Sequence, residues 1–359
     1  MAREAGLHGR TGLALSAPRV PRARVLLAAA CAACFGCGSE GALVGVIASD
    51  GGGAADSTVD GALDSAGEDG IGAGEAGGDG AFEAGDEGPL EEAGDGSLDA
   101  GGDGPLGPFS TPTVVDAIDD PGSNNTDPSM TSDARELYFV SDRSGNQDIW
   151  VSRRASAGDA WAAPDPVAEL NTPMAEQAPA VSFDGLTLWF SRSVVARQPQ
   201  IWVTTRSALG QTWSSPTPVT ELNGAGIEIS AKVDETSLLM FFESTRSGTS
   251  QLYASTRPNA QSPWGTPAPI QGLGPTGTAH DPFVASLGLR VWFESTQTGG
   301  GDLYAADRAS VTDPFANVTP LSELDTPAQE ADPWLSPDLH YILFASDRSG
   351  NMQIYQSSR

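Results

Sequence analysis

The chain has 359 residues, a formal net charge of −28 and only three cysteines. A surface this acidic argues against a nucleic-acid binder, because binding to phosphates requires a basic face. All three cysteines precede residue 38, so a fold held together by disulfides is excluded for the rest of the chain.

Residues 1–37 have the pattern of an export signal. Three arginines between residues 19 and 24 precede an apolar run, 25–36, that is too short to span a membrane as a helix. The segment resembles a bacterial lipoprotein signal, in which a cysteine after the apolar run is lipidated. Cys37 is the preferred site because it leaves the run intact, and Cys31, which follows three alanines, is the alternative. An ordinary cleaved signal is the simpler interpretation.

Residues 38–107 form the second segment, which consists mainly of Gly, Ala, Asp and Glu and carries seventeen acids and no base. A segment of this composition cannot bury enough apolar surface to offset the entropy lost on ordering, so we expect a disordered acidic linker. A calcium-binding array is the alternative, but the spacing of the acids is irregular and the EF-hand pattern is absent.

Residues 108–359 repeat themselves five times, with a period of 51 or 52 residues. One marker is a hydrophobic–aromatic pair, at Ile149-Trp150, Ile201-Trp202, Leu252-Tyr253, Leu303-Tyr304 and Ile354-Tyr355. A second marker is a phenylalanine at positions 139, 190, 242, 293 and 344. Markers that stay in phase over five units indicate one structural unit repeated along the chain.

Each unit reads as four short strands. In the first unit, residues 136–141 and 147–153 are rich in β-formers and are separated by a turn cluster, and a Trp-Pro stretch, 161–171, follows. Prolines suit an outer edge strand, where a missing N–H costs no ladder hydrogen bond. Four-stranded units of this size predict an all-β, five-bladed β-propeller.

The closure of the ring is also predicted. The fifth unit ends at Arg359 after its third strand, whereas residues 109–118 resemble the missing fourth strand, with Phe109 lying 52 residues before Trp161. We therefore expect this N-terminal strand to complete the last blade, which removes exposed sheet edges.

The segments 141–153, 170–191 and 324–355 resemble TolB-type, WD40-like propeller repeats. The resemblance covers 109–359 and implies the propeller fold. It leaves the function open, because propellers serve in binding, scaffolding and catalysis.

An acid lies near the start of each predicted inner strand, at Asp127, Glu176, Glu228, Asp281, and Glu330 with Asp332. One interpretation is structural: these acids pair with arginines such as Arg143, Arg246 and Arg348. The other is a ligand site at the mouth of the channel, formed by Asp127, Glu176, Glu228, Asp281 and Asp332. Within it, Asp127, Asp281 and Asp332 occupy one repeat position, each before a proline, and their oxygens would suit Ca²⁺.

No catalytic residue is assigned, because the chain contains neither Gly-x-Ser-x-Gly nor His-Glu-x-x-His. We expect an exported, non-catalytic interaction module, anchored by lipid in the outer membrane and facing the periplasm or the cell surface. Its partner would be an envelope protein or a polysaccharide. We expect no cofactor, apart from the Ca²⁺ that the three aspartates would suit. The alternative is an extracytoplasmic glycan hydrolase or lyase that uses the channel-mouth carboxylates.

Overall fold

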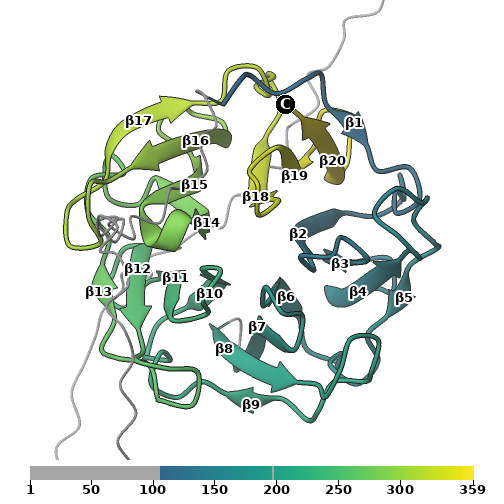
Figure 1. The fold of residues 1–359 in the computed structure, drawn as a ribbon, viewed down its shortest axis with the longest axis horizontal. Helices are drawn as coiled ribbons and strands as arrows, with labels where there is room; N and C mark the ends of the chain where they lie inside the picture. Colours follow the sequence, from purple (N-terminus) through teal and green to yellow (C-terminus); the bar gives the residue numbers. More distant parts are fainter. Residues whose placement is uncertain (1–105, 196–197) are drawn as a thin grey trace, which may run out of the picture. The chain divides into compact units, whose positions relative to one another are not determined.

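The computed structural model describes residues 106–195 and 198–359, which fold as a ring of five antiparallel four-stranded sheets (Figure 1). This confirms the predicted all-β, five-bladed propeller. The signal, the lipidation sites Cys37 and Cys31, and the acidic linker up to residue 105 lie outside the described residues. Within those described ranges, no helix is long and apolar enough to cross a membrane.

Each blade runs from an inner strand at the axis to an outer strand at the rim. Blade 1 contains β2 (Asn125–Met130), β3 (Glu136–Ser141), β4 (Asp148–Arg153) and β5 (Asp165–Pro166). Blade 2 contains β6 (Glu176–Val181), β7 (Thr187–Val195), β8 (Gln198–Thr205) and β9 (Thr217–Pro218). Blade 3 contains β10 (Glu228–Val233), β11 (Leu239–Ser244), β12 (Gln251–Thr256) and β13 (Ala268–Pro269).

Blade 4 contains β14 (Ala279–Ala285), β15 (Arg290–Ser295), β16 (Asp302–Asp307) and β17 (Ala316–Pro320), with a 3₁₀ turn, η1 (Ser286–Gly288), after its inner strand. Blade 5 contains β18 (Glu330–Leu335), β19 (Tyr341–Ser346) and β20 (Gln353–Ser358), and its outer strand is β1 (Thr113–Val114). All outer strands except β1 end at a proline, which has no N–H to extend the ladder.

Strand β1 closes the ring as predicted. It pairs antiparallel with β20, placing Thr113 opposite Gln356 and Val114 opposite Tyr355. The Val115 N–H then donates to the Ile354 carbonyl at 2.9 Å. The paired strand is shorter than the predicted segment 109–118, but Phe109 before it is 5% exposed. The first strand of the domain thus completes the last blade.

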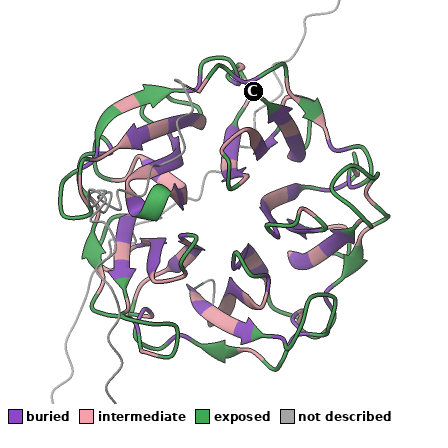
Figure 2. Ribbon diagram, viewed as in Figure 1, coloured by how far each residue is buried: buried purple, intermediate pink, exposed green. Residues whose placement is uncertain are grey.

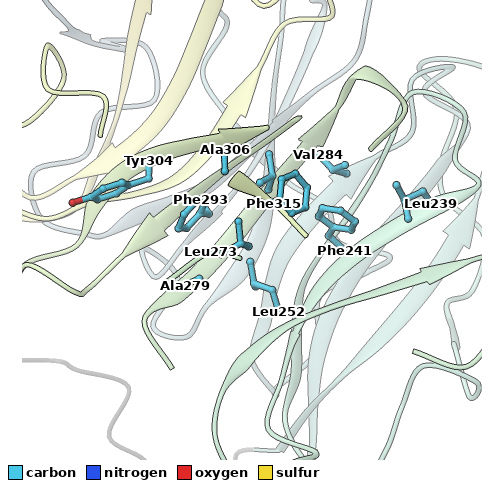
Figure 3. Close-up of a cluster of buried hydrophobic side chains, with 11 residues drawn as sticks. Leu239, Phe241, Leu252, Leu273, Ala279, Val284, Phe293, Tyr304, Ala306 and Phe315 are labelled. Carbon is cyan, nitrogen blue, oxygen red and sulfur yellow. The ribbon is translucent and has the colours of Figure 1, made fainter. Parts of the chain in front are cut away.

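Hydrophobic side chains of neighbouring blades form the core. Between blades 3 and 4, Leu239 and Phe241 pack with Val284, Phe293 and Phe315 (Figure 3). The Phe241 and Phe315 rings meet edge to face, with centroids 6.0 Å apart. The two middle strands of a blade are mostly buried, whereas the outer strands are exposed (Figure 2). The repeated phenylalanines predicted from the sequence are therefore core residues, all fully buried.

The arginine that follows the third strand of each blade stacks on the aromatic ring that precedes the outer strand of the same blade. The distances from the guanidinium carbon to the ring centre are 4.0 Å for Arg154–Trp161, 4.4 Å for Arg206–Trp213, 4.4 Å for Arg257–Trp264, 4.6 Å for Arg308–Phe315 and 4.2 Å for Arg359–Phe109. These cation–π contacts explain why the arginine and the aromatic residue repeat together.

Every inner strand contains a β-bulge that the sequence did not reveal. Its central residue has a left-handed backbone, with φ of 53° at Asp127, 51° at Ala178, 56° at Ser230, 44° at Asp281 and 53° at Asp332. The pairing register with the second strand shifts across these residues in all five blades. A bulge redirects side chains, and here it does so at the repeat position that carries three aspartates.

Candidate functional site

Three aspartates from three blades converge at the axis of the ring. Asp127 of β2, Asp281 of β14 and Asp332 of β18 each place a carboxylate oxygen within 4.8 Å of the other two. The Asp127 N–H donates to Asp332 Oδ2 at 3.1 Å, and the Ser230 hydroxyl donates to Asp281 Oδ1. Because each aspartate occupies the bulge position of its strand, the bulges bring the three carboxylates together.

Lys232 of β10 places one positive charge beside this aspartate triad. It is the only lysine of the chain, its side chain is buried, and its Nζ donates to the Pro179 carbonyl at 2.9 Å. Burial lowers the pKa of Lys232, and the charges of Asp127, Asp332 and Asp281 oppose that shift. The sequence analysis missed Lys232, although a single lysine in a chain with eighteen arginines was a usable signal.

The triad is continuous with a second layer of ionisable groups in blades 3 and 4. Burial, with the carboxylates of Glu243 and Asp127, raises the pKa of Asp281 to about 6. Burial and Asp281 raise the pKa of Glu294 on β15 to about 8, and Gln329 Nε2 donates to its Oε1 at 3.0 Å. Carboxylates this close resist simultaneous ionisation, so the group retains protons at pH values where isolated acids are ionised.

His280 precedes Asp281 on β14 and forms an ion pair with β11. Burial alone would lower its pKa, but Glu243, whose Oε2 lies 3.2 Å from His280 Nδ1, raises it to about 9 with help from Asp281 and Glu294. Burial also raises the pKa of Asp332 well above its usual range, with Asp127 and Asp281 adding to the shift. The side-chain cluster around the aspartate triad therefore contains both charge signs but more acid than base.

The other predicted site acids, Glu176 and Glu228, lie in buried ion pairs instead of in the triad. Both side chains are fully buried; Glu228 Oε2 lies 2.8 Å from Arg246 Nη2, and Glu176 Oε1 lies 2.8 Å from Arg192 Nε. In blade 5, Glu330 pairs in the same way with Arg348 at 3.0 Å. These three glutamates therefore have the arginine partners that the structural interpretation requires.

Two blades depart from this pairing. In blade 1, Asn125 occupies the glutamate position and accepts from Arg143 Nη2 at 2.7 Å, and in blade 4 the position is Ala279. In blade 2 the partner, Arg192, lies two residues after Phe190, whereas the partner in blades 3 and 5 lies four residues after the equivalent phenylalanine. The sequence analysis did not identify Arg192, because it is out of phase with the repeat.

A second acidic group lies near the start of blade 5. Asp302, Asp325 and Glu330 also place oxygens within 4.8 Å of one another. Burial, together with Asp302, raises the pKa of Asp325 to about 6. Since Glu330 is already paired with Arg348, this group offers a weaker cation site than the aspartate triad.

Comparison with protein-family models finds no match, and no curated protein matches the sequence. Solved structures with a similar fold include TolB from Acinetobacter baumannii, at 18% identity and a TM-score of 0.43, covering 66% of this chain and 55% of that chain. They also include an endo-arabinase from Bacteroides thetaiotaomicron VPI-5482, at 14% identity and a TM-score of 0.50, covering 66% and 94%. A GH43 endo-arabinanase from Bacillus licheniformis matches at 13% identity and a TM-score of 0.47, covering 67% and 95%.

These neighbours establish the β-propeller fold and nothing finer. Two TolB structures are among the solved structures with a similar fold. The propeller that the resemblance to TolB-type repeats implied is present in the five four-stranded sheets of this chain. The match spans about half the length of the A. baumannii protein. A propeller fold does not by itself determine a function.

Proposed function

We propose that the propeller is a non-catalytic, ligand-binding module of the cell envelope and that its channel binds a divalent cation, Ca²⁺, between Asp127, Asp281 and Asp332. The observation that carries the proposal is the approach of these three carboxylates to within 4.8 Å of one another. Hard carboxylate oxygens that converge from separate strands suit Ca²⁺, which accepts flexible geometry and completes its shell with water.

The charges of the described residues are consistent with a divalent ion. If a bound cation displaced the protons of the triad, the three carboxylates and the ammonium of Lys232 would carry two negative charges in total, and His280 with Glu243 forms an ion pair. Glu294, with a pKa of about 8, is largely protonated at neutral pH. A divalent cation would therefore neutralise the channel, and would replace the protons that the raised pKa values of Asp281 and Asp332 indicate.

A calcium titration of the full chain tests the proposal. We expect millimolar Ca²⁺ to raise the melting temperature and EDTA to reverse the rise. Asp127→Asn combined with Asp281→Asn should retain the fold and lose the response, whereas Asp302→Asn, in the second acidic group, should keep it. If millimolar Ca²⁺ does not stabilise the parent chain, the cation proposal is wrong and Lys232 alone serves as the counter-charge.

A second candidate function is that of a glycan hydrolase or lyase. The observation that favours it is the unlike environment of two neighbouring carboxyl groups, since Glu294 has a pKa of about 8 and Asp281 one of about 6. Acid–base catalysis on glycosides requires such an unlike pair. Incubation with arabinan, xylan and aryl glycosides tests it. Activity that Glu294→Gln abolishes would favour the hydrolase. If no substrate yields product, the catalytic function is wrong and the binding-module proposal stands.

The proposed location depends on the sequence of the first 107 residues. An export signal with Cys37 lipidated would anchor the acidic linker, and the linker would hold the propeller near an envelope protein or polysaccharide. A single acyl chain binds a membrane weakly, so retention needs the several chains of a lipoprotein. Metabolic labelling with a lipid precursor should label the parent and Cys31→Ala but not Cys37→Ala. A soluble, unlabelled parent would contradict this address.

A further inference from the structure

The propeller axis carries its acids on one side and the only lysine of the chain on the other. The bulge positions of the five inner strands hold, in blade order, Asp127, Ala178, Ser230, Asp281 and Asp332. The aspartates thus come from three consecutive blades, 4, 5 and 1, whose inner strands β14, β18 and β2 follow one another around the axis (Figure 1). Blades 2 and 3 place no carboxylate at this position, and Lys232 comes from blade 3.

The Lys232 side chain is fixed at its tip but forms no direct ion pair. Its Nζ donates to the Pro179 carbonyl of β6, so the side chain crosses from blade 3 to blade 2. Within residues 106–195 and 198–359, no carboxylate lies close enough to Nζ for an ion pair, and the Pro179 carbonyl accepts only one of its three N–H bonds. The ammonium therefore acts on the aspartates through its charge and not through contact.

Burial makes the charges of the lysine and of the aspartates interdependent. Lys232 is 6% exposed, and a buried ammonium is costly unless opposite charges compensate it. The charges of Asp127, Asp332 and Asp281 oppose the effect of burial on the pKa of this ammonium. Conversely, three carboxylates with oxygens within 4.8 Å of one another repel each other unless a cation lies near. Each sign of charge therefore stabilises the other.

The lysine also leaves the aspartates available to an ion. Each aspartate of the triad remains partly exposed, so an ion from solvent can contact it. Because the ammonium contacts none of the three carboxylates, the place between them stays open to a second positive charge. The ion that enters must share the triad with a fixed unit charge, which attracts the same carboxylates and repels the ion.

We propose that Lys232 determines which ion charge the aspartate triad selects. This rests on the proposed function, because it concerns the selectivity of the same cation site. With Lys232 present, three ionised carboxylates leave two negative charges, which a divalent ion neutralises. Without the lysine, three negative charges remain, and a trivalent ion of similar oxygen chemistry matches them better. The repulsion between the ammonium and the bound ion also weakens binding, which keeps the site reversible.

Thermal unfolding of the full chain in EDTA, CaCl₂ and LaCl₃ tests the proposal through Lys232→Met, which keeps a long apolar side chain and removes the charge. In EDTA the variant should melt below the parent, and Ca²⁺ should close most of this gap because the ion replaces the lost charge. The half-saturating Ca²⁺ concentration should fall by about tenfold or more. The preference for La³⁺ over Ca²⁺ should rise by about tenfold or more relative to the parent.

Arg246→Met is the matched control, because it removes another buried cation, the partner of Glu228, away from the triad. It should also melt below the parent, but by the same amount in EDTA and in Ca²⁺.

A double variant tests the charge balance without any added ion and covers the case in which Lys232→Met alone does not fold. Lys232→Met combined with Asp127→Asn removes one charge of each sign, so the double variant should fold and should melt above Lys232→Met in EDTA. Asp127→Asn should stabilise the Lys232→Met chain by more than it changes the melting temperature of the parent. An equal effect in both chains would mean that Lys232 does not balance the triad.

The outcomes separate this inference from the proposed function. If the parent responds to Ca²⁺ and Lys232→Met keeps the parent's preference between Ca²⁺ and La³⁺, the lysine is a packing residue and the inference is wrong, while the cation site stands. If neither chain responds to either ion, the proposed cation site is wrong and the inference fails with it. A response of Lys232→Met alone would support the inference and show that the ammonium excludes the ion from the parent.

Discussion

Replacing Phe109 by alanine should show how much the closing segment contributes to the stability of the ring. The Phe109 side chain is 5% exposed and packs in the cluster that contains Trp292, Leu321 and Tyr355. The guanidinium of Arg359 also stacks on this ring, with its carbon 4.2 Å from the ring centre. Phe109→Ala therefore removes both a buried ring and the surface on which the last arginine of the domain stacks.

The expected loss is large relative to the stability of a domain. Truncating a buried phenylalanine to alanine costs about 3–5 kcal/mol, and loss of the cation–π contact adds about 0.5–1 kcal/mol. Domains are stable by only about 5–15 kcal/mol. For a domain of this size, each kcal/mol shifts the melting temperature by about 2–4 °C. We expect Phe109→Ala to lower the free energy of unfolding by about 4 kcal/mol and the melting temperature by about 10 °C.

Equilibrium urea unfolding and a thermal melt measure both quantities. Phe183→Ala is the matched control, because that side chain is 47% exposed and its truncation should change the stability by no more than about 0.5 kcal/mol. Deleting 109–118 should have a stronger effect, leaving the edge of β20 unpaired and causing aggregation. Equal effects of Phe109→Ala and Phe183→Ala would refute the closure argument.

Three further predictions concern the interior and the linker. Arg246→Ala should cost about 3 kcal/mol in urea unfolding, because it leaves fully buried Glu228 unpaired, whereas Arg153→Ala, whose side chain is 45% exposed, should cost less than about 1 kcal/mol. The pKa of Glu294 rises from 4.5 to about 8 on folding, so parent stability falls as the pH rises through that window. Glu294→Gln should gain on the order of 5 kcal/mol relative to the parent between pH 4.5 and 8; a pH-independent difference would contradict the assignment. Deleting 40–100 should leave the melting temperature nearly unchanged. A large shift would show that the predicted boundary between the linker and the propeller is wrong.

The repeat and the closure were predictable because they depend on local patterns that recur. A buried phenylalanine such as Phe293 sits at the same depth in every blade, so its position repeats with the period of the fold. Phe109 stayed in phase with Trp161 because each stacks under the arginine of a neighbouring strand. Periodicity in the chain thus reflects periodicity in packing.

The details of the channel were not predictable, because they depend on departures from the repeat. Lys232 occurs in one blade only, and Arg192 reaches Glu176 from a position two residues out of phase. The left-handed backbone at Asp127 is not visible in the sequence, because the residue there is not a glycine. The sequence showed that an acid recurs near the start of each inner strand. Which of these acids meet at the axis depends on how the bulge turns each strand.

The position of β1 has a mechanical consequence. Any pull on the chain ahead of residue 106 enters the ring through a strand of two residues that is held to β20. Strands β18, β19 and β20 pair with one another over more residues. The outer strands β5, β9 and β13 also pair over only two residues, but a pull from the N-terminal side reaches β1 first. Under load the ring should therefore yield first at blade 5, by release of β1, while the other four blades keep their sheets intact. In a pulling experiment from the N-terminal side, this predicts an early, small extension that precedes the unfolding of any complete blade.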